Sequence, residues 1–195
     1  MVKIGVILGS TRTKALGEKI FKYLKSNIQV RDVEFNWLDL KDYPLPLYDH
    51  PQTPLEDEIT DLNSAEASWL NDLDQQDGYV ILTPEYDRAI TGVLKNALDF
   101  VGPQVNRKPV HVVAYSHFSD GGIVAAASIV PILQMLNMIV LPSPALLWDA
   151  DKNFATDGKL ITGAENSDHF EQRLKSVFDE IGFYTQVLAE NPYQG

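Results

Sequence analysis

Five short apolar segments alternate with helical patterns along this chain of 195 residues, and no other feature constrains its fold as strongly. The apolar segments are rich in β-branched residues and span 2–8, 33–40, 78–83, 110–115 and 138–141. Helical periodicity occupies 13–28, 55–73, 92–101, 123–135 and 168–190. This alternation predicts a single α/β domain over residues 1–195, with a doubly wound five-stranded parallel sheet and helices on both faces.

Local features refine this outline. Segment 33–40 alternates apolar and polar residues, as an edge strand with one wetter face does. Pro131 is expected to kink or interrupt its helix, and segment 142–163 is expected to be irregular. Segment 41–53 is rich in proline and is expected to be a loop. Its large apolar side chains either cover a pocket or a partner subunit, or pack on the domain's own flank: Tyr43, Leu45, Leu47 and Tyr48.

Composition excludes several classes of function. The chain has no cysteine, which excludes disulfides and thiolate chemistry. Its formal net charge of −11 makes nucleic acid and anionic membranes poor partners. There is neither an apolar run long enough to span a membrane nor a secretory signal, so we expect a cytoplasmic protein. No histidine pair or carboxylate cluster has the spacing of a metal site, and none is expected.

The loop Gly9-Ser10-Thr11-Arg12 joins the first apolar segment to the first helical one. At such a junction, free backbone N–H groups and the positive end of the helix favour an anion. Hydroxyl groups and Arg12 suit a terminal phosphomonoester, as in a mononucleotide. Neither G-x-G-x-x-G nor G-x-x-x-x-G-K-[ST] is present, which excludes the dinucleotide fingerprint and the Walker A loop. An ordinary turn with a helix-capping hydroxyl is the alternative.

Two further loops are expected to meet the first. Thr83–Asp87 follows the third apolar segment and Ser116–Gly122 follows the fourth. With the strand order 2-1-3-4-5, all three loops meet at the switch point, where such sheets bind ligands. A rigid edge at Pro84, a flat face at Tyr86 and close backbone approach at the third loop's glycines suit a planar heteroaromatic ring. Glu85 is equally compatible with a carboxylate at a helix start.

These residues resemble the NAD(P)H-dependent FMN reductase family of flavodoxin-like proteins, whose members include quinone, azo-dye and chromate reductases. The resemblance rests on Gly9–Arg12, Thr83–Phe100, Lys108–Pro109 and Gly121–Gly122, and it covers residues 1 to about 142. The second stretch is the specific one, because it is similar to P-E-Y-N-x-S-x-P-G-x-L-K-N-A-x-D-W. The resemblance implies a flavodoxin-like sheet and a homodimer or homotetramer.

The resemblance also implies one FMN site built from all three loops. Ser10 and Arg12 would bind the phosphate, while Leu16, Gly17 and Glu18 would close that loop at the helix start. The isoalloxazine ring would be lined by Pro84, Glu85, Tyr86 and Asp87, with a far wall of Ser116, His117, Gly121 and Gly122. The flavin carries the chemistry, so no catalytic side chain is implied, and His117 has no recognisable nucleophile partner. Lys95 and Asn96 are expected to support the Thr83–Asp87 loop or a subunit contact, with contact to a ligand as the alternative.

The implied activity is hydride transfer from NAD(P)H through FMN to a quinone or another small electron acceptor, by a ping-pong mechanism. A flavodoxin-like electron carrier or flavin-binding module without its own NAD(P)H turnover is the alternative, since the acidic chain suits a basic redox partner. A diverged relative without FMN is a third reading. NADH and NADPH both remain open: Arg88 and Arg107–Lys108 are either a 2′-phosphate site or solvated surface charge.

The chain departs from the family pattern at the ring. Asp87 replaces an asparagine, and its charge would be unfavourable beside a reduced, anionic flavin. Ala89 replaces a serine and Thr91 a proline, while Ser116–Phe118 stand where small residues and glycines are common. These changes predict weaker FMN binding and either a narrower ring slot or a reshaped substrate face.

Overall fold

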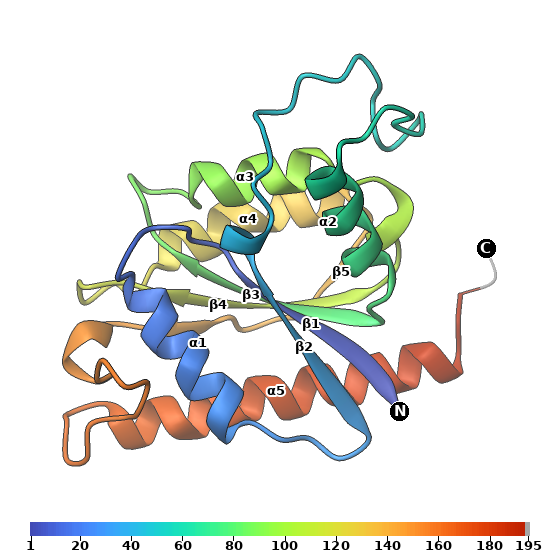
Figure 1. Ribbon diagram of the computed structural model, residues 1–195. Helices are drawn as coiled ribbons and strands as arrows, with labels where there is room; N and C mark the ends of the chain where they lie inside the picture. Colours follow the sequence, from blue (N-terminus) through green and yellow to red (C-terminus); the bar gives the residue numbers. More distant parts are fainter. Residues whose placement is uncertain (194–195) are drawn as a thin grey trace.

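The computed structural model describes residues 1–193, and its centre is a parallel sheet (Figure 1). Its strands are β1 (Val2–Leu8), β2 (Val33–Asp39), β3 (Gly78–Pro84), β4 (Pro109–Tyr115) and β5 (Ile139–Val140), in the order β2-β1-β3-β4-β5. All neighbouring strands pair in parallel. The predicted flavodoxin-like order 2-1-3-4-5 is therefore confirmed, and so is the edge position of β2, most of whose residues are only partly buried.

The fifth position of the sheet is shared by two short strands. After β5, a sixth strand, β6 (Ala145–Leu147), pairs in parallel with the second half of β4. Pro142 and Pro144 separate β5 from β6, and a proline has no N–H to donate to the ladder. The prediction of an irregular segment over 142–163 is therefore wrong at its start, because the strand resumes once the prolines have passed.

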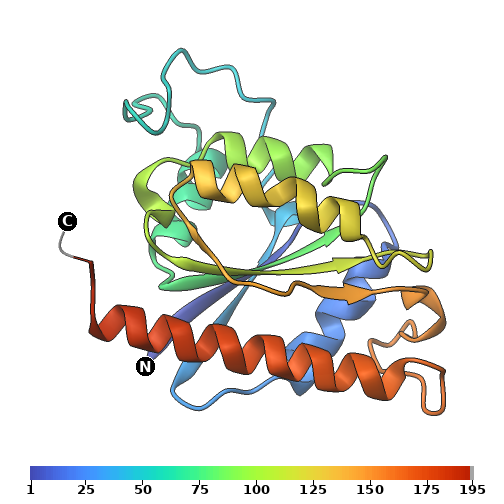
Figure 2. The same ribbon diagram turned by 180° about the vertical axis from the view of Figure 1, so that it is seen from behind.

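Helices cover both faces of the sheet, as predicted (Figures 1 and 2). On one face lie α1 (Leu16–Asn27) and α5 (Ser167–Glu190), and on the other lie α2 (Ser64–Asp74), α3 (Gly92–Asp99) and α4 (Ile123–Met135). Every residue of β3 and β4 is buried, as expected for central strands covered on both sides. Short 3₁₀-helices occupy Leu40–Asp42, Pro103–Val105 and Ala150–Lys152.

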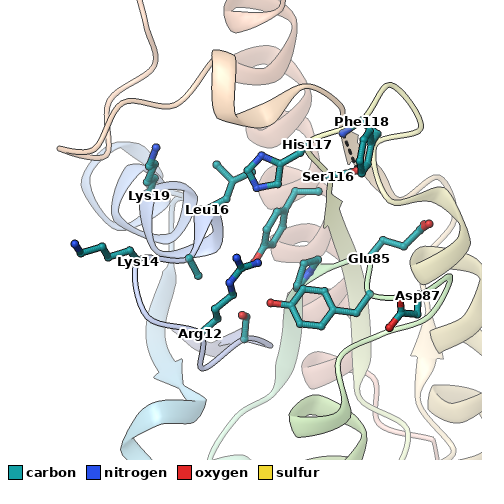
Figure 3. A pocket seen from close by; sticks show the side chains of 14 residues that line it. Arg12, Lys14, Leu16, Lys19, Glu85, Asp87, Ser116, His117 and Phe118 are labelled. Carbon is teal, nitrogen blue, oxygen red and sulfur yellow. Dashed lines mark hydrogen bonds between the residues drawn. The ribbon is translucent and has the colours of Figure 1, made fainter.

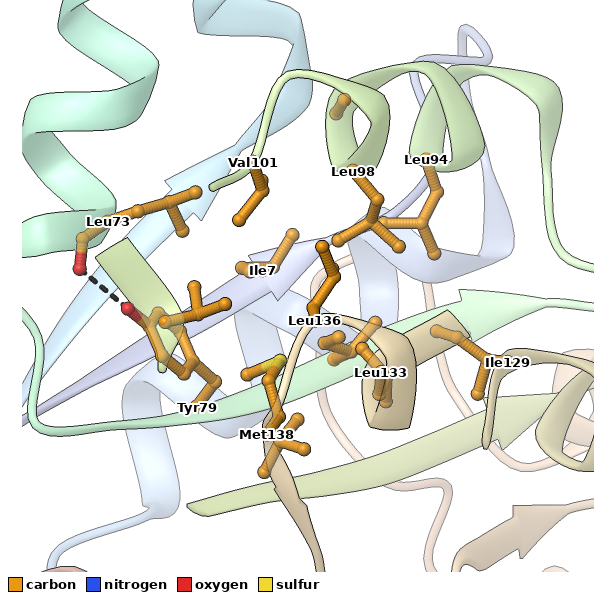
Figure 4. Close-up of a cluster of buried hydrophobic side chains, with 14 of the residues drawn as sticks. Ile7, Leu73, Tyr79, Leu94, Leu98, Val101, Ile129, Leu133, Leu136 and Met138 are labelled. Carbon is orange, nitrogen blue, oxygen red and sulfur yellow. Dashed lines mark hydrogen bonds between the residues drawn. The ribbon is translucent and has the colours of Figure 1, made fainter. Parts of the chain in front are cut away.

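The core under α2, α3 and α4 fixes these helices on the sheet (Figure 4). Leu94 and Leu98 of α3 and Leu133 of α4 are buried there against Ile7 of β1. Tyr79 of β3 satisfies its buried hydroxyl by donating to the Leu73 carbonyl oxygen at 2.6 Å. This packing holds the starts of α3 and α4 at the carboxyl edge of the sheet, beside the loops that precede them.

Two helices begin later than the periodicity predicts. The helix predicted over 55–73 begins only at Ser64, because Asn63 accepts hydrogen bonds from the N–H groups of Ala65 and Glu66, and the Glu66 carboxylate accepts from Asn63 N–H. This capping box defines a start that apolar spacing alone does not reveal. The first helix begins at Leu16 rather than at residue 13, and Lys14 has a left-handed φ of 55°. By contrast, α4 continues through Pro131.

The proline-rich loop 41–53 packs mainly on its own domain. Tyr43, Leu45 and Tyr48 contact the core beneath α2 and α3, whereas Leu47 is 82% exposed. Asn96 of α3 holds the loop, since its side chain accepts from Tyr48 N–H at 2.9 Å and donates to the Pro46 carbonyl oxygen at 2.7 Å. Asn96 therefore does support a loop, but it is loop 41–53 rather than the predicted loop Thr83–Asp87. No helix within residues 1–193 is both long and apolar enough to cross a membrane.

Candidate functional site

A pocket of about 550 Å³ opens where the loops after β1, β3 and β4 meet (Figure 3). This volume lies within the range of small-molecule sites. The lining residues are Ser10, Arg12, Lys14, Ala15, Leu16, Lys19, Pro84, Glu85, Tyr86, Asp87, Tyr115, Ser116, His117 and Phe118. The structure thus brings together most of the predicted site residues, but Gly17, Glu18, Gly121 and Gly122 do not line the pocket.

The first loop presents an uncapped helix end to this pocket. Ala15 occupies the N-cap position of α1 and has no side chain that could accept from the helix. The N–H groups of Leu16 and Gly17 meet no main-chain acceptor within residues 1–193. The first turn of α1 therefore keeps free donors at the pocket, which is the arrangement that favours a bound anion.

Positive side chains gather at the same end. Arg12, Lys14 and Lys19 line the pocket, and in the described part of the chain none of them forms an ion pair. Arg12 reaches into the pocket, whereas Lys14 and Lys19 point away from its centre (Figure 3). In a chain with a net charge of −11, a cluster of unpaired cations marks this end of the pocket as the part that attracts an anion.

Tyr115, which sequence reasoning missed, closes the pocket beneath the first loop. It is the last residue of β4 and only 3% exposed, and its Oη has no hydrogen-bond partner within residues 1–193. The tyrosine lies so close to Gly17 that a Cβ on that glycine would come within 2.8 Å of Tyr115 Cζ. Burial raises the pKa of the Tyr115 phenol. The only signal in the sequence is its position directly before Ser116.

Gly17 and Glu18 therefore contribute indirectly. Gly17 leaves room for the Tyr115 ring, and no other residue type would do so without displacing that ring. The Glu18 carboxylate is turned to the neighbouring Lys41, with which it forms an ion pair. Both residues were predicted to close the phosphate loop at the helix start, and neither of them lines the pocket.

The second loop turns sharply between Tyr86 and Ala89. These two residues exchange both backbone hydrogen bonds at 2.9 Å, and Asp87 and Arg88 between them have φ values of 50° and 66°. Two successive positive φ values are typical of a type I′ turn, in which Asn, Asp and Gly are favoured at the first central position. Replacing the family's asparagine with Asp87 therefore keeps the turn chemistry, although it changes the charge at the pocket.

An ionic network braces this turn against the loop after β4. One oxygen of the Glu85 carboxylate accepts from Val124 N–H at 2.9 Å and from Ala125 N–H at 3.2 Å, so Glu85 caps α4. Arg88 bridges the other Glu85 oxygen at 3.2 Å and Asp120 at 3.1 Å. Glu85 is thus a helix-start carboxylate, but for a helix that begins 38 residues later in the chain.

The three cations considered for binding a 2′-phosphate all have contacts elsewhere in the protein. Arg88 is engaged with Glu85 and Asp120. Lys108, which directly precedes β4, donates to the Asp74 carbonyl oxygen at 2.9 Å. The Arg107 guanidinium carbon lies 4.7 Å from the centre of the Tyr193 ring. None of the three cations lines the pocket.

The third loop forms the upper wall of the pocket in Figure 3. Ser116 Oγ accepts from Phe118 N–H at 2.9 Å, which fixes the turn and leaves the Phe118 ring 75% exposed. His117 Nδ1 lies 3.4 Å from the Asp151 carboxylate, so a carboxylate rather than a nucleophile is its neighbour. Ser116 and His117 are therefore placed at the pocket as predicted, together with Phe118.

Gly121 and Gly122 shape this loop from behind. Their φ values of 61° and 81° lie in the left-handed region that favours glycine. A Cβ on Gly121 would press on Leu146 at 3.0 Å, and Gly122 is the N-cap residue of α4. Neither glycine is among the residues that line the pocket, so in this structure they shape the turn into α4 rather than the pocket surface.

Thr91, another departure from the family pattern, connects the first two loops. Its Oγ1 donates to the Gly9 carbonyl oxygen at 2.6 Å and accepts from Leu94 N–H at 3.1 Å. The threonine therefore caps α3 and ties the strand end of β1 to the loop after β3, which a proline side chain could not do. Among residues 1–193, no group of histidines and carboxylates is arranged to hold a metal ion.

Comparisons with known proteins agree on one family. The family model described as NADPH-dependent FMN reductase matches residues 2–153. An NAD(P)H-dependent FMN reductase of Schizosaccharomyces pombe is 31% identical over 97% of this chain and 92% of its own length. An FMN-dependent NADPH-azoreductase of Staphylococcus haemolyticus is 29% identical over 97% of this chain and 96% of its own.

A solved structure shows the same fold. The flavoenzyme NAD(P)H:(acceptor) oxidoreductase of Paracoccus denitrificans superimposes with a TM-score of 0.75 over 94% of this chain and 98% of its own, at 24% identity. The family is one of enzymes, which decides against the alternative of an electron carrier without turnover. The chain belongs to the NADPH-dependent FMN reductase family and is an oxidoreductase that uses FMN and NAD(P)H.

Proposed function

We propose that this reductase holds FMN in the three-loop pocket and passes hydride from NAD(P)H to a quinone or a similar flat electron acceptor by a ping-pong mechanism. The observation that carries the proposal is the phosphate end of the pocket, where an uncapped α1, the unpaired Arg12 and the unpartnered Tyr115 hydroxyl come together. All three offer donors and none offers a negative charge, so the chemistry fits a phosphate dianion.

The residues present fit FMN at both ends. Ser10, Arg12 and the N–H groups at the start of α1 would hold the phosphate. The segments 84–87 and 116–118 line the rest of the pocket and would flank the ring. Tyr86 is 38% exposed and Phe118 is largely exposed, so flat aromatic surface is available for stacking. Bound FMN would supply the hydride chemistry at its N5.

The pocket favours one shared site for the two substrates. Tyr86 and Phe118 both line it, and these two exposed aromatic side chains suit a nicotinamide ring and a quinone equally well. The protein's own residues would orient each ring in turn and keep the flavin in place between the two half-reactions. Since both substrates would use the same face, the oxidised nicotinamide must leave before the acceptor binds.

Initial-rate kinetics test this scheme directly. With NADPH varied at several fixed concentrations of a soluble benzoquinone, the double-reciprocal plots are expected to be parallel. Intersecting plots would contradict the shared site. The physical support can be tested separately by desalting the protein after adding FMN, because a protein that elutes without flavin absorbance would contradict tight binding in this pocket.

The second part of the proposal is a homodimer or homotetramer. An apolar depression of about 390 Å³ lies between α3, α4 and residues 53–55, and Met135 at its rim is largely exposed. Covering such a surface with a second copy would bury it. Sedimentation equilibrium is expected to give a multiple of the 21.8 kDa chain, and Met135→Glu should shift it toward the monomer. A wild-type protein that sediments as a monomer at micromolar concentration would contradict this assembly.

A further inference from the structure

We infer that Tyr115 is a phosphate-binding residue, whose phenol Oη donates a hydrogen bond to the terminal phosphate of FMN. The inference rests on the proposed function, since it assigns a role within the proposed FMN site. It adds a contact from β4 to a phosphate end that otherwise comes entirely from the first loop and α1.

The first argument is the state of the hydroxyl. Tyr115 is almost completely buried, and its Oη has no hydrogen-bond partner in residues 1–193. Buried hydroxyls in folded proteins nearly always have a partner, and one without a partner needs an explanation. Tyr79, the other buried tyrosine of the central strands, illustrates the rule, because its hydroxyl donates to the Leu73 carbonyl oxygen. A ligand oxygen is the partner that Tyr115 lacks.

The second argument is position. Tyr115 lines the pocket, and its ring reaches the Cα of Gly17 in the first turn of α1. Ser10 and the Gly17 N–H are its polar neighbours, and their influence on the phenol opposes the rise of its pKa that burial causes. Ser10 and the start of α1 are also the groups proposed to hold the phosphate. The phenol therefore points at the same small volume as the free N–H groups.

The third argument is chemical. Burial raises the pKa of the phenol, so Tyr115 stays protonated near neutral pH and acts as a donor. A neutral O–H donor suits a phosphate dianion, and it adds no charge that would need a partner when the site is empty. In addition, Ala15 supplies no hydroxyl at the N-cap of α1. The tyrosine supplies one from the other side of the pocket, and only a glycine at position 17 leaves room for it.

The test compares FMN with riboflavin, which lacks the phosphate. For wild-type protein and Tyr115→Phe, both freed of flavin, the dissociation constants of FMN and riboflavin are measured by quenching of flavin fluorescence, and apo-protein stability is measured by thermal unfolding. Tyr115→Phe is expected to weaken FMN binding by about tenfold, the loss of one hydrogen bond to a charged group. Riboflavin binding should be unchanged, and the apo-protein should be no less stable, because the variant removes only an unpartnered hydroxyl.

Tyr23→Phe is the matched control. Tyr23 is a buried tyrosine of α1 in the same apolar cluster, but it does not line the pocket, so its variant should bind FMN as the wild type does. Unchanged FMN affinity in Tyr115→Phe would overturn the inference while leaving the proposed function intact. Equal losses for FMN and riboflavin would also overturn it, because the hydroxyl would then act on the ring. A wild type that binds neither flavin would overturn both proposals.

Discussion

The loop after β1 and the loops after β3 and β4 line the same pocket, but they satisfy their polar groups in opposite ways. At the end proposed to hold the phosphate, the Leu16 and Gly17 N–H groups of α1 meet no main-chain acceptor, and Arg12 has no ion-pair partner in the described chain. At the opposite end, proposed to hold the flavin ring and here called the ring end, Glu85, Arg88 and Asp120 bond to one another and to the start of α4. One end is left open to a ligand, while the other is already complete.

This difference separates affinity from stability. Groups that have no partner in the protein add little to its folding, but they are free to bind an anion. Groups that already hold each other keep the two ring-side loops in register before any ligand arrives, which is the preorganisation that binding and catalysis need. Substitutions at the phosphate end should therefore change FMN affinity more than stability, and those at the ring end should do the reverse.

The largest effect is expected from Glu85→Ala at the ring end. The variant removes the cap of α4 and leaves Arg88 with only Asp120 as its partner. Losing a partly buried carboxylate with these bonds should lower the free energy of unfolding by about 3 kcal/mol. Urea denaturation of the flavin-free protein measures this, with the exposed Glu58→Ala as control. A stability equal to that of the control would show that the network does not brace the loops.

Gly17→Ala tests the close contact between the start of α1 and Tyr115. The added methyl group would collide with the Tyr115 ring and lie 3.0 Å from Leu8, and overpacking of this kind lowers the free energy of unfolding by about 2 kcal/mol. FMN affinity should fall as well, since Tyr115 must move. Gly92→Ala is the matched control, because a Cβ there meets nothing within 4 Å. If both alanine variants unfold at the same temperature, the close approach of Tyr115 to Gly17 is not a constraint.

Arg12→Gln should affect affinity alone. Losing one charge-assisted bond to phosphate should raise the dissociation constant of FMN by about tenfold, or about 1.4 kcal/mol. Unfolding of the flavin-free protein should be unchanged, because Arg12 has no ion-pair partner among residues 1–193. Arg31→Gln, a highly exposed arginine outside the pocket, serves as control in flavin titrations. A marked loss of stability in Arg12→Gln would break the proposed separation.

Thr91→Ala is expected to have a smaller effect, and on stability. It removes the cap of α3 and the bond to the Gly9 carbonyl oxygen, which should lower the free energy of unfolding by about 1 kcal/mol. Because that bond ties the first loop to the second, FMN affinity should fall slightly in the same variant. The exposed Thr162→Ala is the control for both measurements. An unchanged midpoint in urea would contradict the capping role.

The smallest expected effect is on the stability of the protein at low pH. The Gly122 N–H, and to a lesser extent Arg88, hold the pKa of Asp120 below its ordinary value. A carboxylate with a lowered folded pKa stabilises the protein above its unfolded pKa of about 4, and this contribution disappears as the pH falls through the lower folded value. Asp120→Asn should therefore flatten the loss of stability below about pH 5. Urea titrations at several pH values give the free energy of unfolding as a function of pH. This dependence should run parallel for the wild type and for Asp57→Asn, whose carboxylate is exposed.

Periodicity was sufficient to predict the alternation of strands and helices, and the flavodoxin-like order implied by the family resemblance was sufficient to predict the meeting of three loops. Both depend on local patterns, namely alternating apolar segments and polar residues directly after strands. The start of α2 was equally local, because the spacing of Asn63 and Glu66 is that of a capping box.

The remaining features depend on tertiary contacts. Glu85 caps α4, which lies far along the chain, and no residue near Glu85 in the sequence indicates this contact. Tyr115 ends an apolar strand like any other, and only the packed structure shows its hydroxyl beside Gly17. Gly121 and Gly122 match the family pattern, but pattern matching cannot tell a backbone turn from a pocket wall.

The division of the fifth strand has a consequence for how molecules meet at high concentration. The edge of a sheet normally offers a row of unpaired N–H and C=O groups on which a second chain can extend the sheet into an aggregate. Here β5 has two residues and β6 three, and Pro142 and Pro144 between them supply no N–H. Ser143 adds a left-handed φ of 56° that bends the edge. The interruption therefore protects this side of the sheet from strand-by-strand growth.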